Sequence, residues 1–266
     1  MHKFISSLQN QVVKRILQLQ EKARARKKEN AFVVEGVREI DLALKGGFKM
    51  LELYYNSDLF PAEKAKNLIS SVSGAVDVTD LSSEVYQKIA YRGSTEGVIA
   101  IFATKELSLD HLTFKNKNPL ILIAEAPEKP GNIGALLRTA DAAAVDAVLI
   151  ANPHTDMFNP NIIRSSVGCV FTNKIATGST SEIISFLKER EIAIFGAALQ
   201  ASVPYHMIDF TGGSAIVVGT EATGLSDEWL QNTTQNILIP MEGEIDSMNL
   251  SVAAGILIFE AKRQRR

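Results

Sequence analysis

Short apolar runs recur at regular intervals through the second half of the chain. Six strand-like segments occur, and in most of them apolar residues follow one another without alternation, as in strands buried on both faces. They span residues 120–126, 147–152, 173–177, 193–199, 215–221 and 236–241. Segments with helical periodicity separate them, which predicts a parallel, doubly wound α/β sheet. Such sheets bind ligands beyond the carboxyl ends of their strands, so the loops after Ala124, Ala198, Gly219 and Pro240 are the predicted binding region.

The first half of the chain alternates less regularly. An apolar stripe that favours an amphipathic helix comes first, and shorter strand-like and helix-like segments follow it. The stripe consists of Val12, Val13, Ile16, Leu17 and Leu19. A polar stretch before Pro119 breaks the pattern. We therefore expect a small α/β domain over residues 1–107, a linker over 108–118 and a larger domain over 119–266.

Composition limits the class of protein. The chain has 266 residues, of which 46% are hydrophobic and 22% charged. No apolar run is long enough to cross a membrane, and the N-terminus lacks the apolar core of a signal peptide. The single cysteine, Cys169, excludes an internal disulfide and is expected to be a small core residue. These features predict a cytoplasmic protein without membrane contact.

Basic residues gather near the N-terminus, although the net charge is only −2. Glu21 is the single acidic residue between Lys14 and Lys28. The basic ones are Lys14, Arg15, Lys22, Arg24, Arg26, Lys27 and Lys28. A run of this kind fits either a solvated helix face or a contact with a polyanion such as RNA.

Several chemistries lack the residues that they require. The turn after the first strand of the larger domain reads APEKPGNIG and has no G-x-G-x-x-G fingerprint, which disfavours NAD. A phosphate-binding loop is also missing, and the four histidines show no metal-ligand spacing, so no metal is expected. Arg138 follows this turn on a helix. Taken alone, it can be a structural partner of Asp141 or a catalytic group.

The last helical segment is apolar on nearly all sides from Leu250 to Phe259. A surface helix would carry a polar face. We therefore expect it to be buried against its own domain or against another copy of the chain.

Three segments occur in a characteristic order: PGNIGALLRTADA (130–142), IVVGTEATGLS (216–226) and IPMEGEIDSMNLSVAAGILIFEAKR (239–263). Together they closely resemble the three motifs of the SpoU (TrmH) family of RNA 2'-O-ribose methyltransferases, within the SPOUT superfamily. Residues 7–44 resemble the L30e-like substrate-binding domain of the family's two-domain members. The resemblance thus spans nearly the whole chain.

The resemblance implies a catalytic domain with a parallel sheet and a deep trefoil knot, and a homodimer in which the C-terminal helix lies at the interface. S-adenosylmethionine (AdoMet) is the implied cofactor. The positions that match its binding residues are Leu199, Gly219, Ile239 and Met248. At Gly219, the missing Cβ would let the backbone approach the adenosine closely.

The reaction that the resemblance implies is methyl transfer to a ribose 2'-hydroxyl. Arg138 matches the residue assigned to activating that hydroxyl. A guanidinium is a poor base, so we expect Arg138 to stabilise the developing 2'-oxyanion and the adjacent phosphate. It would act as a base only if the site strongly lowered its pKa. Asn132 is expected to orient the nucleotide. The matching residues of the second and third motifs are Glu221, Ser247 and Asn249, of which Ser247 and Asn249 can also be simple helix caps.

This chain departs from the family pattern at three positions. Thr220 and Ala222 replace the usual Asn and Gly beside Glu221, which bears on the choice of target. Met248 replaces Leu, a change that preserves volume.

The expected function is 2'-O-methylation of RNA, with 23S rRNA favoured over tRNA, in either a housekeeping or an antibiotic-resistance role. A tRNA 2'-O-methyltransferase, a knotted enzyme that methylates a base nitrogen and a catalytically silent RNA-binding protein stay open as alternatives.

Overall fold

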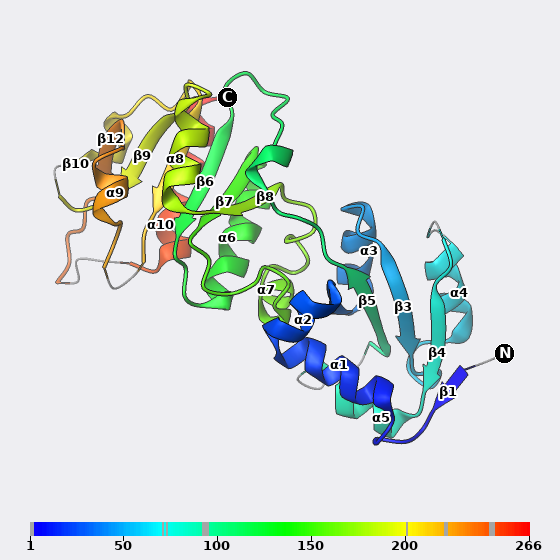
Figure 1. Ribbon diagram of the computed structural model, residues 1–266. Coiled ribbons are helices and arrows are strands. Elements are labelled where there is room, and N and C mark those ends of the chain that lie inside the picture. Colours follow the sequence, from blue (N-terminus) through cyan, green and yellow to red (C-terminus); the bar gives the residue numbers. More distant parts are fainter. Residues whose placement is uncertain are drawn as a thin grey trace. The chain divides into compact units, whose positions relative to one another are not determined.

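The computed structural model describes residues 3–70, 72, 74–91, 96–200, 202–220, 223–244 and 248–266. The chain divides into two compact units (Figure 1). The first contains residues 1–105 together with 156–172, and the second contains 106–155 and 173–266.

The first unit is built on a mixed sheet of five strands in the order β1-β4-β3-β5-β2. Strand β5 is antiparallel to its neighbours β2 and β3, whereas β1, β4 and β3 run parallel. The strands are β1 Lys3–Ile5, β2 Ala31–Glu35, β3 Met50–Tyr55, β4 Asp77–Leu81 and β5 Val98–Ala103. The helices are α1 Gln11–Glu21, α2 Ala23–Glu29, α3 Val37–Lys45, α4 Ala62–Ser70, α5 Ser83–Ile89 and α7 Pro160–Ser165.

The predicted apolar stripe buries one face of α1. Val13, Ile16 and Leu19 are each at most 1% exposed and join a core with residues of α5 and the sheet. The side chain of Asn10 caps the helix by accepting from the amide of Val12 (2.9 Å). The helix ends at Lys22, whose backbone is extended, so the basic residues divide between α1 and α2.

Residues 156–172 lie within the catalytic domain expected from the sequence, but in the structure they form part of the first unit's core. Phe158 and Phe171 both stack on Phe32 of β2, with ring centroids 4.5 and 5.7 Å away. Gly46 lies so close to this segment that a Cβ there would come within 2.1 Å of the carbonyl oxygen of Phe171. The first unit is therefore discontinuous in sequence.

The second unit contains a seven-stranded sheet, parallel throughout, in the order β10-β12-β9-β11-β6-β7-β8. The strands are β6 Leu120–Glu125, β7 Ala147–Ala151, β8 Ile175–Gly178, β9 Ala193–Ala197, β10 Ser202–Pro204, β11 Ser214–Val218 and β12 Gln235–Leu238. The helices are α6 Pro130–Ala142, α8 Thr180–Lys188, α9 Asp227–Leu230 and α10 Leu250–Gln264, with short 3-10 turns η2 Leu109–His111 and η3 Tyr205–Met207.

The prediction of a parallel α/β sheet is confirmed, and each of the six predicted strands is present. Every residue of β6 is buried because helices cover both faces of the sheet. Helix α8 contacts β7, β9 and α9, whereas α10 contacts β6, β11 and α6 (Figure 1). The deep trefoil knot stays a prediction.

Candidate active site

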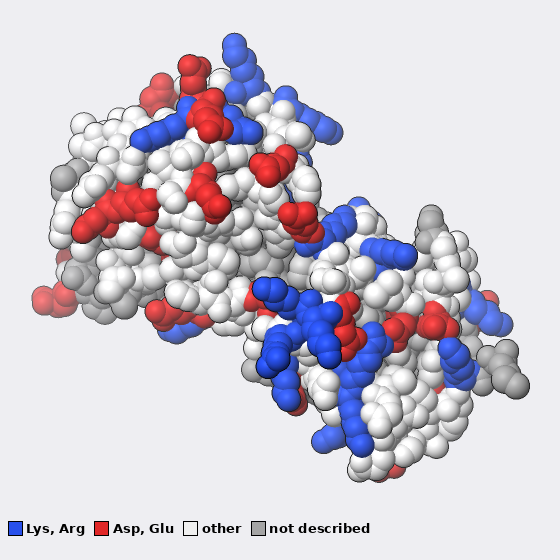
Figure 2. All heavy atoms as spheres, in the orientation of Figure 1, with Lys and Arg blue, Asp and Glu red and all other residues white. Residues whose placement is uncertain are grey.

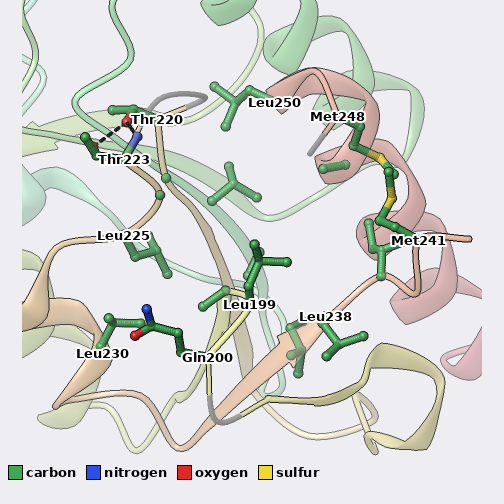
Figure 3. A pocket seen from close by; sticks show the side chains of 18 of the residues that line it. Leu199, Gln200, Thr220, Thr223, Leu225, Leu230, Leu238, Met241, Met248 and Leu250 are labelled. Atoms are coloured by element: carbon green, nitrogen blue, oxygen red, sulfur yellow. Dashed lines mark hydrogen bonds between the residues drawn. The ribbon is translucent and has the colours of Figure 1, made fainter. Parts of the chain in front are cut away.

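A cavity of about 480 Å³ opens at the carboxyl ends of β9, β11 and β12. Its walls come from residues 197–200, 218–220, 223–225 and 237–239, and from the beginning of α10. The positions predicted to bind a cofactor, Leu199, Gly219, Ile239 and Met248, all line it. Leu199 and Met248 are labelled in Figure 3. Most of the cavity therefore lies at the strand ends that a doubly wound sheet uses for ligands.

Gly219 is required by the loop that follows it. A Cβ at this position would lie 2.2 Å from the carbonyl carbon and oxygen of Gly224. The two ends of this loop are tied by backbone hydrogen bonds between Thr220 and Gly224 (3.1 and 3.0 Å). The hydroxyls of Thr220 and Thr223 also share a hydrogen bond of 2.8 Å (Figure 3). The glycine thus makes the tight turn possible, in addition to any approach by a ligand.

Two methionines face each other across one side of the cavity. Met241 follows β12 and Met248 precedes α10, and Figure 3 shows their sulfur atoms pointing toward one another. Sequence reasoning chose Met248 but missed Met241. Its place directly after Pro240, in a loop already predicted to bind ligand, was the available signal.

The first and third motifs meet through two asparagines. Asn249 donates from Nδ2 to Oδ1 of Asn132 (3.3 Å), although the two are 117 positions apart. Asn249 also caps α10, since its Oδ1 accepts from the amide and the hydroxyl of Ser251 (3.0 and 2.6 Å). One side chain therefore both caps α10 and contacts Asn132 of the first motif.

Arg138 lies on α6, the helix whose first turn contains Asn132. Its side chain is exposed, and in the part of the chain that the structure describes it forms no ion pair with Asp141. The simple structural explanation for this arginine therefore finds no support. An exposed guanidinium is available to an anionic ligand.

Glu221 and Ser247, predicted from the second and third motifs, lie outside the described residues, as does Ala222. Among the residues that are described, no group of three or more His, Cys, Asp or Glu side chains is placed to hold a metal ion. No described helix combines the length and apolar character needed to span a bilayer.

The predicted RNA-binding residues differ in their surroundings. Five of them are exposed on or beside α1 and α2, where Figure 2 shows basic side chains gathered. These are Lys14, Lys22, Arg24, Lys27 and Lys28. We call these five residues the basic surface.

Arg15 and Arg26 are occupied within the fold. Arg15 pairs with Glu29 (2.6 Å) and Glu52 (2.8 Å). Arg26 is 3% exposed and forms a two-pronged ion pair with Asp156 (3.0 and 2.6 Å). Both guanidiniums are therefore excluded from the basic surface.

Helix α10 is buried on one side only. Leu250, Ala254, Leu257, Ile258 and Ala261 are covered. The other side carries Val252 and Phe259, which are 53% and 47% exposed. Being seven positions apart, these two side chains lie on the same face of the helix. An apolar face of α10 is thus uncovered in the single chain.

Comparison with known proteins bears directly on this site. Residues 119–259 match the SpoU rRNA Methylase family, and residues 10–100 match the MRM3-like substrate binding domain. The chain is 28% identical over 260 residues to the 23S rRNA (guanosine(2553)-2'-O)-methyltransferase RlmP of Bacillus subtilis, covering 98% of this chain and 99% of that protein.

A second relative and a solved structure point to the same family. The 23S rRNA (guanosine-2'-O-)-methyltransferase RlmB of Vibrio vulnificus is 32% identical over 195 residues, which cover 71% of this chain and 79% of that protein. A crystal structure of an AdoMet-bound rRNA methyltransferase from Sinorhizobium meliloti has a TM-score of 0.89 at 28% identity, covering 98% of this chain and 97% of the other. Since the family match spans more than half of the sequence, the chain belongs to the SpoU rRNA methylase family, as its three ordered motifs predicted.

Proposed function

We propose that this protein transfers the methyl group of AdoMet to a ribose 2'-hydroxyl of 23S rRNA. The observation that carries the proposal is the convergence of the second and third motifs on one cavity, beside the contact between Asn132 and Asn249. Relatives that span almost the whole chain and carry rRNA methyltransferase names support the same reaction and substrate.

The residues of the cavity fit AdoMet. A volume of about 480 Å³ lies within the usual range for small-ligand sites, roughly 300–1,000 Å³. The walls combine strand-end backbone with apolar side chains such as Leu199 and Leu238, which suits the adenosine of AdoMet, and Asp227 adds a carboxylate that suits its positive charge. We assign Leu199, Gly219, Ile239 and Met248 to holding the cofactor.

The protein's task is alignment and charge stabilisation. When bound, AdoMet would supply a methyl group on its sulfonium sulfur. Transfer to the 2'-oxygen breaks the bond between that methyl and the sulfur, leaves a neutral thioether and releases the hydroxyl proton to solvent, so no metal is needed. We assign Asn132, held by Asn249, to orienting the target nucleotide. Arg138 stabilises the negative charge that develops on the 2'-oxygen and the charge of the adjacent phosphate. We also assign Glu221 of the second motif and Ser247 of the third motif to the catalytic centre.

The basic surface is proposed to bind RNA backbone. Its five side chains are exposed, and phosphate contacts position an RNA without reading its sequence. The match of residues 10–100 to a substrate-binding domain supports this assignment. We also propose a cytoplasmic location, which an rRNA substrate supports. Methylation of tRNA and catalytically silent RNA binding are the competing outcomes.

The uncovered face of α10 supports a homodimer. Val252 and Phe259 expose apolar area on a helix that contacts α6, which carries Asn132 and Arg138. We propose that a second copy of the chain covers this face. Light scattering during gel filtration should give a dimer for the native protein and a monomer for Phe259→Asp. A native monomer would refute this part.

Transfer of tritiated methyl from AdoMet to rRNA tests the reaction. RNA from a strain lacking the gene should accept label, and Arg138→Ala should reduce the rate at least about 100-fold, as expected when a charge-stabilising group is lost. Arg190→Ala, which removes a half-exposed arginine of the same unit outside the cavity lining, serves as the matched control. AdoMet binding without label in any RNA would favour the silent RNA-binding alternative.

A further inference from the structure

A buried carboxyl group sits at the end of the central strand β6. Glu125 is 6% exposed, and no described cation pairs with it. Its Oε2 accepts from the amide of Ser226 (2.8 Å), and its Oε1 accepts from the hydroxyl of the same residue (2.7 Å). A carboxylate is costly to bury without a cation, so it needs such donors. Glu125 therefore depends on Ser226, which lies 101 positions later in the chain.

Ser226 is held in an unusual way. It is the N-cap residue of α9, where a serine hydroxyl usually accepts from an amide of its own helix. Here the side chain makes no such bond and donates to Glu125 instead. The carboxylate thus fixes both the backbone and the side chain of Ser226. Gly224 and Leu225 before Ser226, and Asp227 after it, all line the cofactor cavity.

The other side of Glu125 is anchored to rigid elements. The hydroxyl of Thr180, the first residue of α8, donates to Oε1 of Glu125 (3.4 Å). That hydroxyl accepts in turn from Nδ2 of Asn152, directly after β7 (2.9 Å). Hydrogen bonds therefore connect the ends of β6 and β7 and the start of α8 to the residue that closes the second motif.

We propose that Glu125 is a positioning residue for the methyl transfer: it holds Ser226, and with it the neighbouring residues that line the cavity, in the arrangement that binds AdoMet. Glu125 also begins the turn that leads to Pro130 and Asn132, so one side chain borders the first motif and fixes the end of the second. The inference rests on the proposed function, because it takes AdoMet as the occupant of the cavity.

Titration calorimetry with AdoMet on the full-length protein tests the proposal without any RNA. Glu125→Ala removes both charge-assisted hydrogen bonds to Ser226 and should raise the Kd by at least about tenfold. Glu125→Gln keeps an acceptor for the amide of Ser226, so it should retain most of the affinity. Ser226→Ala, which keeps the carboxylate, should raise the Kd by less than Glu125→Ala. In methyl-transfer assays, the KM for AdoMet should follow the same order.

Glu182→Ala is the matched control. Glu182 completes a capping box with Ser179 at the start of α8, in the same unit but outside the cavity. Its loss should lower the melting temperature and leave the Kd unchanged. The proposal is overturned if Glu125→Ala and Ser226→Ala both bind AdoMet within twofold of the native protein. If Glu125→Ala does not fold, the Ser226→Ala result decides alone. Failure of RNA methylation with AdoMet binding intact would count against the proposed function only.

Discussion

Two arginines of α2, Arg24 and Arg26, look alike in the sequence but differ in the structure. Comparing them tests which of the N-terminal basic residues bind RNA and which stabilise the fold. Arg26 is 3% exposed, whereas Arg24 is exposed. Arg26 donates to both oxygens of Asp156 and also, from Nη1, to the carbonyls of Leu19 (2.6 Å) and Gln20 (3.0 Å). We expect Arg26→Ala to destabilise the first unit and Arg24→Ala to weaken RNA binding.

The expected loss of stability in Arg26→Ala follows from the groups that lose their hydrogen-bond partner. Truncation would strip the cation from Asp156 and remove a donor from two carbonyls. Breaking a buried ion pair costs about 3–5 kcal/mol. The side chain of Asp156 is 31% exposed, so water can solvate its carboxylate once the arginine is gone. We therefore expect the free energy of unfolding to fall by about 3 kcal/mol, the lower end of this range. For a unit of this size, that lowers the melting temperature by about 10 °C. Lysine should not rescue the variant, since it cannot form the two-pronged pair.

The assay must report on each unit separately. Hydrogen exchange of strand β2 reports on the first unit, while fluorescence of Trp229, the chain's only tryptophan, reports on the second. Arg26→Ala should speed exchange in β2 and leave the Trp229 transition in place. Arg24→Ala should change stability by less than about 0.5 kcal/mol. A loss below about 1 kcal/mol for Arg26→Ala, or a larger drop in RNA affinity than for Arg24→Ala, would refute this reasoning.

Three further predictions address the site and the termini. Gly219→Ala should raise the Kd for AdoMet more than tenfold, because a Cβ would lie 2.2 Å from the backbone of Gly224; calorimetry measures this, and native affinity would contradict it. RNA affinity falls as salt rises, and Lys27→Ala should make the slope of log K against log salt less negative by about 0.7–0.9 in RNA titrations. An unchanged slope would contradict this prediction. Hydrogen bonds from Arg263 and Gln264 lower the pKa of Glu260 to about 2, below the unfolded value of about 4.3. Its stabilising effect should therefore be complete above about pH 4.3 and disappear as the pH falls to about 2, so that melting curves of Glu260→Gln differ from the native protein at pH 7 but converge near pH 2.

The fold of the second unit was largely predictable because its strands are buried on both faces. A continuous apolar run such as residues 120–124 predicts a buried strand even when the neighbouring strands are not known. Strand β10 has no such signal: Ser202–Pro204 is three residues long, half-buried and partly polar. Pairing with β12 creates this strand, and pairing cannot be seen in local sequence.

The place of residues 156–172 was not predictable for a related reason. Phe158 and Phe171 pack on Phe32, more than a hundred positions earlier. Long-range contacts of this kind leave no periodicity. Nor does a run of basic residues reveal which of its members have a carboxylate nearby, as Arg15 and Arg26 do.

The candidate site shows the same division. The positions proposed to bind the cofactor came from the ordered motifs, and all four of them line one cavity in the structure. The sequence offered a weak sign for Glu125, an acid that closes an otherwise apolar strand, but its partner Ser226 became visible only in the fold.

Mapping of ribose methylation in 23S rRNA tests the central claim most directly. A methylated 2'-oxygen cannot attack the neighbouring phosphate, so the RNA resists alkaline cleavage at that nucleotide. RNA from cells with and without the gene should differ at a nucleotide of 23S rRNA that becomes cleavable on deletion. The native gene should restore resistance, and Arg138→Ala should not. Unchanged 23S rRNA, with the lost methyl group found on a base nitrogen or in tRNA, would contradict the account.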